Sequence, residues 1–407
     1  MKIRLFNLYY LFFSIALSAA VFPSILGNYS GFIIPLGIGT FVLDEVVLLT
    51  SIVLMLCYII KKSKISNKIS GYGSFLVAFL IFLVGGFALS LFRADNSLEI
   101  ISRDRWIVLN FFAVFMPFVY NLNMYELRKL YKHFAVFMGV LTAVKVSCFL
   151  ILDPGHQLSQ FGPSFLFMLS LCLAIYLWSD ESIIKKCICS FIVLAVSIIG
   201  EQMSAILLTV MCIFIPIYFS PFRSYISATI LLPFLGLLTF FPLINVDLTD
   251  LALTFNFNPL NFTVVDKLLT YLDLWAAPFV DITLAEFLLG RGAGYYFEIY
   301  TYNELLNEFN SIKHSLAHNF LVTFFIKFGL VGLIFLLAIV FSIFAPISRK
   351  FNFENATLLK LLLFLMLCNF FSTPGIWKIR KGIFLWFLVG LCYFYRRYTV
   401  AKNVQYS

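Results

Sequence analysis

The residue types best suited to chemistry gather where His314, His318 and Asn319 precede a long apolar run. Imidazole titrates near neutral pH, so either histidine is a candidate general base that takes a proton from a hydroxyl group. The histidines are four positions apart, and a helix would place them on one face. In a second interpretation, they cap the apolar segment or bind interfacial water. The pattern predicts a base and leaves this structural role open.

Arg291 is the first candidate for binding an anion, because its planar guanidinium group matches two oxygens of a phosphate. It stands between Gly290 and Gly292, with Gly294 two positions further on. Such glycines let backbone amides approach an anion, and they are equally typical of a tight turn. The segment is not a dinucleotide-binding fingerprint, because no strand is expected before it.

Two further groups of cations stand next to apolar runs. Arg103 and Arg105 precede one run, where they suit a second phosphate or an acceptor sugar, or form an interfacial pair with neighbouring carboxylates. Lys378, Arg380 and Lys381 precede the last run, where they suit an anionic lipid. A misplaced boundary of that run would explain the second group equally well.

Charged residues inside or beside apolar runs also need a reason, because a charge near the bilayer centre costs roughly 2.5 to 3.5 kcal/mol on insertion scales. Lys145 lies in the middle of one run and Glu201 lies between two others. We expect Lys145 to face the bundle interior, where it pairs with Glu201 or binds a phosphate. Glu201 at the outer interface is the alternative.

Metal and nucleic-acid chemistry are not indicated. The chain has no Asp-x-Asp pair in an outer loop and no His, Asp and Glu cluster at ligand spacing, so we expect metal-independent chemistry without a cofactor. Its eight cysteines form no C-x-x-C pair. A net charge of +9 would suggest nucleic acid in a soluble protein, but this composition indicates a bilayer.

The elements that position these residues are predicted to be transmembrane helices. Of 407 residues, 62% are hydrophobic and 12% charged, which is far from the composition of a soluble domain. A spanning helix needs about 20 mostly apolar residues. Twelve runs fit, at residues 6–26, 41–60, 75–92, 107–122, 134–152, 164–178, 187–200, 204–219, 227–244, 320–345, 357–371 and 383–395. We expect one transmembrane domain over residues 1–407, with the first run as an uncleaved signal anchor.

The distribution of Lys and Arg predicts the orientation. Of 29 such residues, 18 lie at the chain ends and in one set of alternate loops, nine lie in the other set, and Lys145 and Lys327 lie within runs. The positive-inside rule makes the first set cytoplasmic and places both termini inside. The short runs on either side of Glu201 decide this assignment, because losing one would invert half of it.

One outer loop, residues 245–319, is far longer than the others, and loops of such length are usually functional or disordered. Apolar residues at helical spacing predict one helix at residues 266–280, and we expect a second amphipathic helix at residues 295–309. The fold class is therefore an all-α polytopic membrane protein of about 12 transmembrane helices, with a large helical loop between helices nine and ten.

Two motifs lie within residues 190–345. His318 and Asn319 are followed after nine residues by Gly329 and Gly332, at the entrance to a helix. Upstream, Trp275 and its neighbour alanine lead to the glycine-rich segment around Arg291. With the long outer loop, these motifs resemble those of the O-antigen ligase and polymerase superfamily, and His318 stands at the motif position.

The resemblance implies a GT-C-like glycosyltransferase in the bacterial inner membrane that acts in its periplasmic loop. Its partners would be a polyprenyl diphosphate-linked oligosaccharide, membrane lipid and a chain-length regulator protein. His318 or His314 would then be the base. The substrate-binding residues would come from Arg291, Arg103, Arg105, Asn319, Glu201, Lys267, Lys378 and Arg380.

Two departures from the family's pattern bear on which reaction is expected. Many ligases have Ser-Arg at the start of the helix after the short outer turn, where this chain has Gly200, Glu201 and no arginine. Lys267 stands roughly where an arginine is common. We therefore favour an O-antigen polymerase over a ligase that delivers glycan to lipid A-core. A flippase or transporter is the alternative outside enzymes, but such proteins show related halves, and none are apparent here.

Overall fold

The computed structural model describes residues 3–22, 33–36, 39–62, 72–92, 101, 104–152, 159–177, 182–199, 208–209, 279, 281–303, 308–314, 319–344 and 379–404. The longer helices are α1 (Ile3–Val21), α2 (Leu43–Lys62), α3 (Tyr72–Ser90), α7 (Met124–Ile151), α8 (Pro163–Leu177), α9 (Ile183–Ile199), α16 (Phe320–Phe344) and α18 (Ile379–Val404). The shorter ones are α5 (Trp106–Phe111), the 3-10 segment η1 (Phe112–Phe115), α6 (Met116–Tyr120) and α15 (Leu284–Leu289). The described chain is therefore mainly helical.

Four of the described helices are long and apolar enough to cross a bilayer, as expected for a helical protein embedded in a membrane. They are Ile3–Val21, Leu43–Lys61, Tyr125–Ile151 and Phe320–Ser342. Shorter apolar helices occupy Ser74–Ser90, Trp106–Tyr120 and Pro163–Leu177. The predicted runs at 204–219, 227–244 and 357–371 lie outside the described residues, apart from 208–209. The total of twelve spans stays a prediction.

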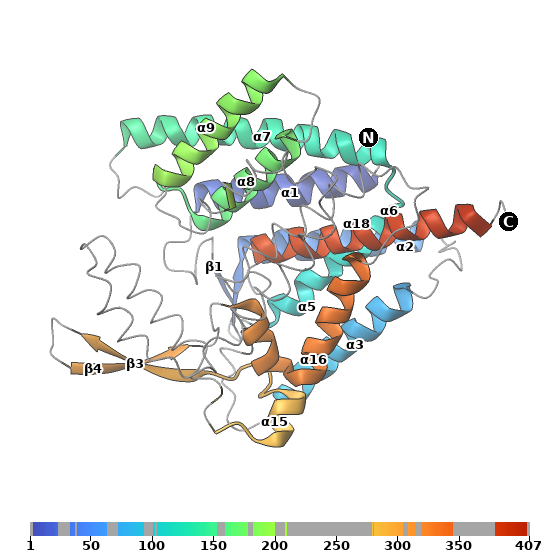
Figure 1. The fold of residues 1–407 in the computed structure, drawn as a ribbon, viewed down its shortest axis with the longest axis vertical. Helices are drawn as coiled ribbons and strands as arrows, with labels where there is room; N and C mark the ends of the chain where they lie inside the picture. The colour runs from blue at the N-terminus through green and yellow to red at the C-terminus, as the bar shows by residue number, and fades with distance from the viewer. Residues whose placement is uncertain are drawn as a thin grey trace.

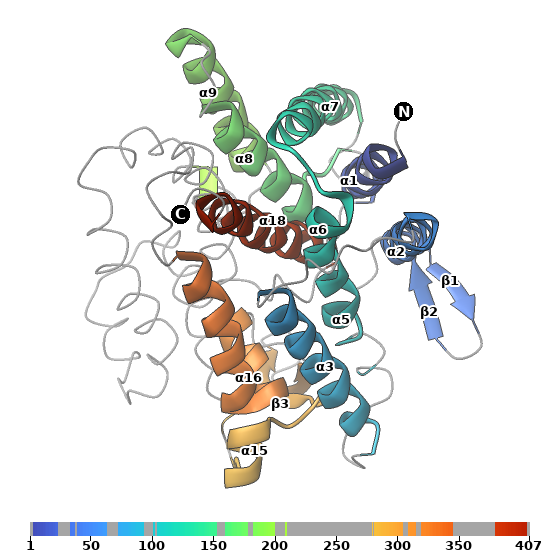
Figure 2. The same ribbon diagram turned by 90° about the vertical axis from the view of Figure 1, so that its right-hand side faces the viewer.

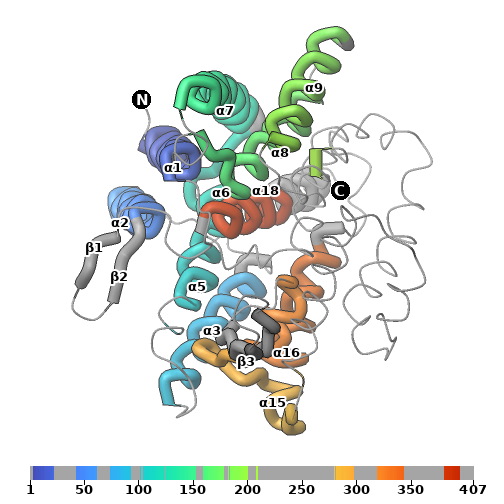
Figure 3. The backbone as a smooth tube through the Cα atoms, turned by 90° about the vertical axis from the view of Figure 1, so that its left-hand side faces the viewer, coloured from blue at the N-terminus to red at the C-terminus, as the bar shows by residue number. Residues whose placement is uncertain are grey.

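Helix α18 runs between two groups of helices, with α1, α7, α8 and α9 on one side and α3 and α16 on the other (Figures 2 and 3). It packs against α5, η1 and α6. Gly390 permits this crossing, because a Cβ atom there would lie under 3.0 Å from the Val114 carbonyl oxygen. In α18, the Phe387 ring lies 4.9 Å from that of Phe12 in α1, and the Trp386 ring lies 6.0 Å from that of Phe79 in α3, measured between centroids. Aromatic packing around α18 thus joins the two groups.

Two short antiparallel hairpins interrupt the helical pattern. Strands β1 (Ile33–Leu36) and β2 (Gly39–Val42) pair directly before α2. Strands β3 (Phe297–Asn303) and β4 (Glu308–His314) pair in the register Phe297↔His314. Both hairpins lie on the left of Figure 1, opposite the marked chain ends.

The predicted amphipathic helix at residues 295–309 is wrong, and with it the wholly helical loop. These residues contribute to the β3–β4 hairpin instead. The sequence of β3, Phe-Glu-Ile-Tyr-Thr-Tyr-Asn, is rich in β-branched and aromatic residues, which fit a pleated strand better than a helix. The spacing of the glutamates suggested a helix, but local strand preference and pairing with β4 decide the outcome. Of the predicted helix at 266–280, only Phe279 is described.

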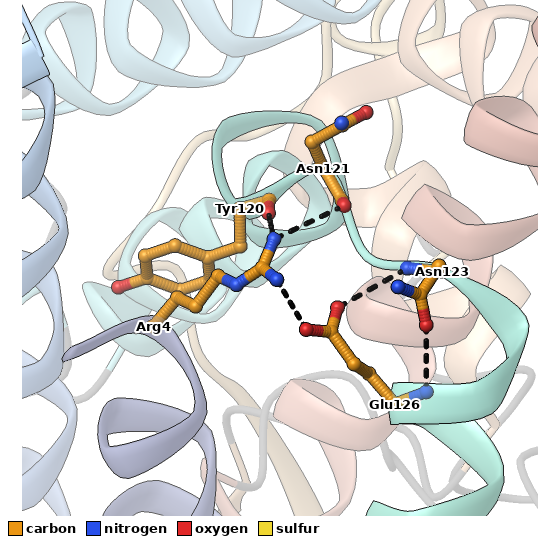
Figure 4. Close-up of polar contacts among 5 residues, drawn as sticks. All are labelled: Arg4, Tyr120, Asn121, Asn123 and Glu126. Atoms are coloured by element: carbon orange, nitrogen blue, oxygen red, sulfur yellow. Dashed lines mark hydrogen bonds and ion pairs between the residues drawn. The ribbon is translucent and has the colours of Figure 1, made fainter. Parts of the chain in front are cut away.

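Arg4, at the start of α1, binds residues at the turn between α6 and α7 (Figure 4). Its guanidinium group forms an ion pair with Glu126 and donates to the Tyr120 carbonyl oxygen at 3.0 Å. Glu126 also completes a capping box, since its backbone amide donates to the Asn123 side chain at 2.8 Å. This arrangement satisfies donors at the first turn of α7.

Contacts of α1 define two ends of the described bundle. Its start meets the end of α6 and the start of α7, whereas Ser18 and Phe22, near its other end, bind Arg380 at the start of α18. We call the end that holds the starts of α2, α5, α16 and α18 the outer end, following the predicted orientation. Which end faces the cytoplasm is still a prediction from Lys and Arg.

Candidate functional site

The glycine-rich segment and the start of α16 pack directly against each other at the outer end. A capping box of Thr283 and Glu286 begins α15, and α15 ends at Gly290, whose φ is +80°. Helix α16 contains a residue with non-helical backbone, Gly329, whose φ is +68°. Positive φ is a conformation that glycine adopts without steric cost. We call residues 290–294 and 326–329 together the glycine joint.

Both glycines are required by close backbone approach. A Cβ atom on Gly290 would lie under 3.0 Å from the Lys327 carbonyl oxygen, and one on Gly329 under 3.0 Å from the Leu288 carbonyl oxygen. At the kink of α16, the carbonyl oxygens of Ile326 and Lys327 accept hydrogen bonds from the amides of residues 291 and 292, at 2.6 and 3.1 Å. The two motifs of the sequence therefore form one structural unit.

Gly332, the second glycine of the motif in α16, serves side-chain packing. A Cβ atom there would lie under 3.0 Å from Cβ of Phe328, 3.1 Å from Phe324 and 3.2 Å from Phe82. The Gly-x-x-Gly spacing thus has a structural explanation: its first glycine makes the kink, and its second makes room for three aromatic rings.

The remaining amides of the glycine-rich turn donate to other elements of the protein. The Ala293 amide donates to Oγ of Ser90, the last residue of α3, at 2.7 Å. The Gly294 amide donates to Oδ2 of Asp104 at 2.8 Å. Of the two readings of these glycines, the structure favours the tight turn, because protein acceptors occupy the amides that an anion would need.

Asp104 and Lys327 form a buried ion pair at the glycine joint. The distance from Lys327 Nζ to Asp104 Oδ2 is 2.6 Å, and the side chains are 1% and 3% exposed. Lys327 also donates to the Tyr295 carbonyl oxygen at 2.9 Å. The sequence placed Lys327 inside a span and Asp104 between two arginines, but gave no sign that they meet.

The Arg291 side chain is largely buried and folds back on its own segment. Its guanidinium carbon lies 4.8 Å from the centroid of the Tyr295 ring, and it donates a hydrogen bond to the Tyr295 hydroxyl. Its Nε lies 3.5 Å from the Glu286 carboxylate. A phosphate that binds Arg291 must therefore compete with one carboxylate and one hydroxyl.

Asn319 is fully buried and caps α16. Its Oδ1 accepts from the amides of Leu321 and Val322 at 2.9 and 3.2 Å, which satisfies donors of the first turn. Its Nδ2 has no acceptor among the residues that the structure describes. The predicted substrate-binding residue thus has a capping oxygen and a separate amide donor.

The two histidines are placed only in part. His314 is the last residue of β4, and its backbone alone is described. His318 lies outside the described residues, directly before Asn319. Four residues separate β4 from the cap of α16, so the hairpin leads straight into the motif.

The two described arginines from the other predicted groups bind carboxylates at the start of α2. Arg105 makes a two-pronged contact with Glu45, at 2.6 and 2.8 Å. Arg380 donates to Asp44 at 2.7 Å and to Oγ of Ser18 at 3.0 Å. Asp44 and Glu45 were missed by sequence reasoning, and their position within an apolar run was the available signal.

The other predicted residues divide into described and undescribed positions. Lys145 faces the bundle interior, as predicted, where its Nζ donates to the Ala20 carbonyl oxygen at 2.6 Å. Lys381 is buried, with Nζ 5.1 Å from the centroid of the Phe167 ring. The predicted residues that lie outside the described part of the chain are Arg103, Glu201, Lys267 and Lys378.

The described outer end therefore carries buried cations at Lys145, Lys327, Arg380 and Lys381, and partly buried ones at Arg105 and Arg291. Four of these cations form ion pairs with carboxylates, so an anionic ligand would have to displace those partners or share the cations with them. Within the described ranges, no three His, Cys, Asp or Glu residues gather to hold a metal.

No family model matches the chain, and no curated protein matches its sequence. The resemblance to the O-antigen ligase and polymerase superfamily therefore rests on the motif residues themselves.

Proposed function

We propose that the protein is a surface-polysaccharide polymerase. It transfers a glycan from polyprenyl diphosphate onto a new lipid-linked repeat unit at the outer face of the membrane. One observation carries this proposal: the two segments that resemble the family, 35 residues apart between Gly294 and Gly329, pack into one joint by backbone hydrogen bonds. This packing supports the proposal because it brings Arg291 of one motif next to the helix that Asn319 of the other motif caps.

The proposed reaction needs a base and a stabilised leaving group. The acceptor hydroxyl gives its proton to His318, or to His314, as its oxygen bonds to the anomeric carbon of the donor sugar. The bond from that carbon to the phosphate oxygen breaks, and polyprenyl diphosphate leaves with the electron pair. The diphosphate is already a good leaving group, so the protein must mainly neutralise charge on it.

The glycine joint contains two cations, Arg291 and Lys327, and we assign Arg291 to the diphosphate because Lys327 is buried in its ion pair with Asp104. Its side chain is 11% exposed, and its present partners are Tyr295 and Glu286. A diphosphate oxygen would replace the Tyr295 hydroxyl, which is the weaker of the two acceptors for a cation. Asn319 Nδ2 is assigned as the second donor, for the sugar or the phosphate, because it has no acceptor among the described residues. Since the Asn319 side chain is fully buried, this contact requires the residues around it to move when the substrate binds.

Polymerase is preferred to ligase because an arginine is missing. Where many ligases have an arginine after the short outer turn, this chain has Gly200 and Glu201. The usual phosphate-binding arginine of a ligase is therefore absent from this position, and the ligase is kept as the alternative enzyme.

Purified protein mixed with lipid-linked repeat units tests the proposal. A ladder of longer glycans is the expected product. Transfer that occurs only when lipid A-core is supplied would replace polymerase with ligase. Translocation of the lipid-linked unit without a new glycosidic bond would replace both with a transporter.

Two substitutions test the assigned residues. His318→Ala and Arg291→Ala are each expected to abolish long-chain product while membrane insertion is unchanged. His133→Ala and Arg128→Ala are matched controls, since both residues belong to the part of α7 at the inner end. Normal chain length in either test variant would remove that residue from the mechanism.

A further inference from the structure

We infer that Asp104 and Lys327 are positioning residues, which hold the glycine-rich turn so that Arg291 faces the diphosphate. The inference rests on the proposed function and names residues that neither motif contains. Neither side chain is a candidate for direct contact, because both are almost completely buried. They would act through the turn that carries Arg291.

The contacts around this pair converge on one stretch of backbone. Oδ2 of Asp104 accepts from both Lys327 Nζ, at 2.6 Å, and the Gly294 amide, at 2.8 Å. Lys327 Nζ also donates to the Tyr295 carbonyl oxygen at 2.9 Å. The pair therefore holds the amide of residue 294 and the carbonyl group of residue 295.

Lys327 contacts the turn a second time through its own backbone. Its carbonyl oxygen accepts from the Gly292 amide at 3.1 Å, next to the bond from the Arg291 amide to Ile326. The backbone amides of residues 291 and 292 are thereby both hydrogen-bonded to one turn of α16. A displacement of α16 at its kink would move Arg291 with it.

The route from the pair to the guanidinium group passes through Tyr295. Lys327 fixes the carbonyl group of Tyr295, and the Tyr295 ring lies under the Arg291 guanidinium group, 4.8 Å from ring centroid to guanidinium carbon. The Tyr295 hydroxyl accepts from Arg291. Loss of the Lys327 bond would release the residue that Arg291 stacks on.

Burying the charged side chains of Asp104 and Lys327 costs free energy, which indicates that their role is to form hydrogen bonds in fixed directions. A buried ion pair often contributes no more to stability than apolar residues of equal volume would. Apolar side chains, however, cannot bind an irregular backbone amide or carbonyl group. At this joint, the ion pair provides hydrogen bonds to residues 294 and 295 in addition to the backbone hydrogen bonds between α16 and residues 291 and 292.

The kinetic test compares Lys327→Met with Arg291→Lys, alone and combined, in the purified full-length protein. Lys327→Met is expected to lower kcat about 10-fold with a smaller change in KM for the lipid-linked donor. If Lys327 acts through Arg291, it has little further effect in the Arg291→Lys protein. Equal fold losses in both backgrounds, or unchanged kcat, would overturn the inference.

A second measurement does not depend on activity. Ala293 is 1% exposed, so Ala293→Cys should react slowly with a membrane-impermeant maleimide. Addition of Lys327→Met is expected to speed labelling about 10-fold, since each 1.4 kcal/mol of lost restraint is a tenfold change in opening. The parent chain corrects for native cysteines, and Lys145→Met is the matched control, a buried lysine that contacts α1 instead. Equal labelling with and without Lys327→Met would overturn the inference.

The double variant Asp104→Asn with Lys327→Met covers the case in which Lys327→Met alone fails to fold. It removes both charges, so no buried carboxylate remains unpaired. We expect it to fold and to keep the fast labelling and the low kcat. If it instead shows wild-type labelling, the pair does not position the turn. If wild-type protein makes no glycan yet labelling still responds to Lys327→Met, the proposed function fails and the structural part of this inference stands.

Discussion

The inner and outer ends of the helix bundle both contain ion pairs, but the pairs differ in burial and in what they hold. At the inner end, the side chains of Arg4 and Glu126 are 15% and 11% exposed. At the outer end, those of Lys327 and Asp104 are 1% and 3% exposed. The inner pair reinforces a helix cap, whereas the outer pair binds backbone that belongs to no regular element.

The two ends also differ in how far local sequence preferences explain their structure. A capping box needs only residues three positions apart, and the sequence of α7 supplies both. The glycine joint needs α3, Asp104 directly before α5, the turn and α16 at once. Positive φ values, the kink in α16 and a buried ion pair each lower stability, and proteins are expected to keep such costly features mainly at functional sites. The comparison therefore favours the outer end as the site.

The substitution Gly329→Ala should break the outer end most severely. An alanine there would combine a disfavoured positive φ with a clash against the Leu288 carbonyl group, at a total cost on the order of 4 kcal/mol. We expect little folded protein and no glycan product. The yield of monodisperse protein and the midpoint of thermal unfolding in detergent measure this.

Gly139→Ala is the matched control for that experiment. Gly139 lies in α7, and a Cβ atom there would meet nothing within 4 Å. Alanine is preferred to glycine inside a helix by up to about 1 kcal/mol, so this variant should be as stable as wild type or slightly more so. If both glycines tolerate alanine equally, the kink of α16 is not required.

How far the sequence could predict these features depends on the range of the interaction. Apolar runs predicted the helices closely: the run at 320–345 is α16, Phe320–Phe344. Hydropathy is a local property, and so the helices were found. The kink at Gly329 was not predicted, because it depends on the carbonyl group of Leu288, 41 positions earlier.

The same reasoning applies to the charged residues. Arg105 and Arg380 were identified as unusual, but their partners Glu45 and Asp44 are 60 and 336 positions away. No local pattern encodes such pairs. The hairpin of β3 and β4 was missed for a different reason, since glutamates at helical spacing outweighed the strand preference of residues such as Ile299 and Thr301.

Arg380→Met tests whether a second buried ion pair at the outer end, that of Arg380 with Asp44, also stabilises the fold. It would leave the Asp44 carboxylate buried without its arginine, at a cost of about 3 kcal/mol, reduced somewhat by the favourable dipole at the start of α2. We expect a clearly lower thermal midpoint. Asp44→Asn in the same chain should restore most of the loss, and failure to do so would mean that Arg380 acts through Phe22 and Ser18.

Asn319 allows the cap of α16 to be separated from the amide donor. Asn319→Ala removes the capping oxygen and should lower stability by about 1 kcal/mol. Asn319→Asp keeps a capping oxygen and loses the Nδ2 donor. Its carboxylate would be buried without a cation among the described residues, and the favourable dipole at the start of α16 offsets only part of that cost, so its thermal midpoint should lie below that of wild type. Glycan synthesis should fall in both variants. Full activity of a stable Asn319→Asp protein would limit Asn319 to capping.

Arg4→Met is expected to have the smallest effect and completes the comparison. Its pair with Glu126 is less buried than the pair of Lys327 with Asp104, so we expect a loss of at most about 1 kcal/mol, well below that for breaking a fully buried pair. The capping box also leaves Glu126 bound to the Asn123 amide at 3.4 Å after the arginine is gone. We therefore expect a thermal midpoint close to wild type and unchanged glycan length. Glu126→Gln is the matched variant, since it removes the charge and keeps the cap. A large loss of thermal midpoint in Arg4→Met but not in Glu126→Gln would show that the bond to the Tyr120 carbonyl group stabilises the inner end. The two ends would then differ in the geometry of their contacts and not in the burial of their ion pairs.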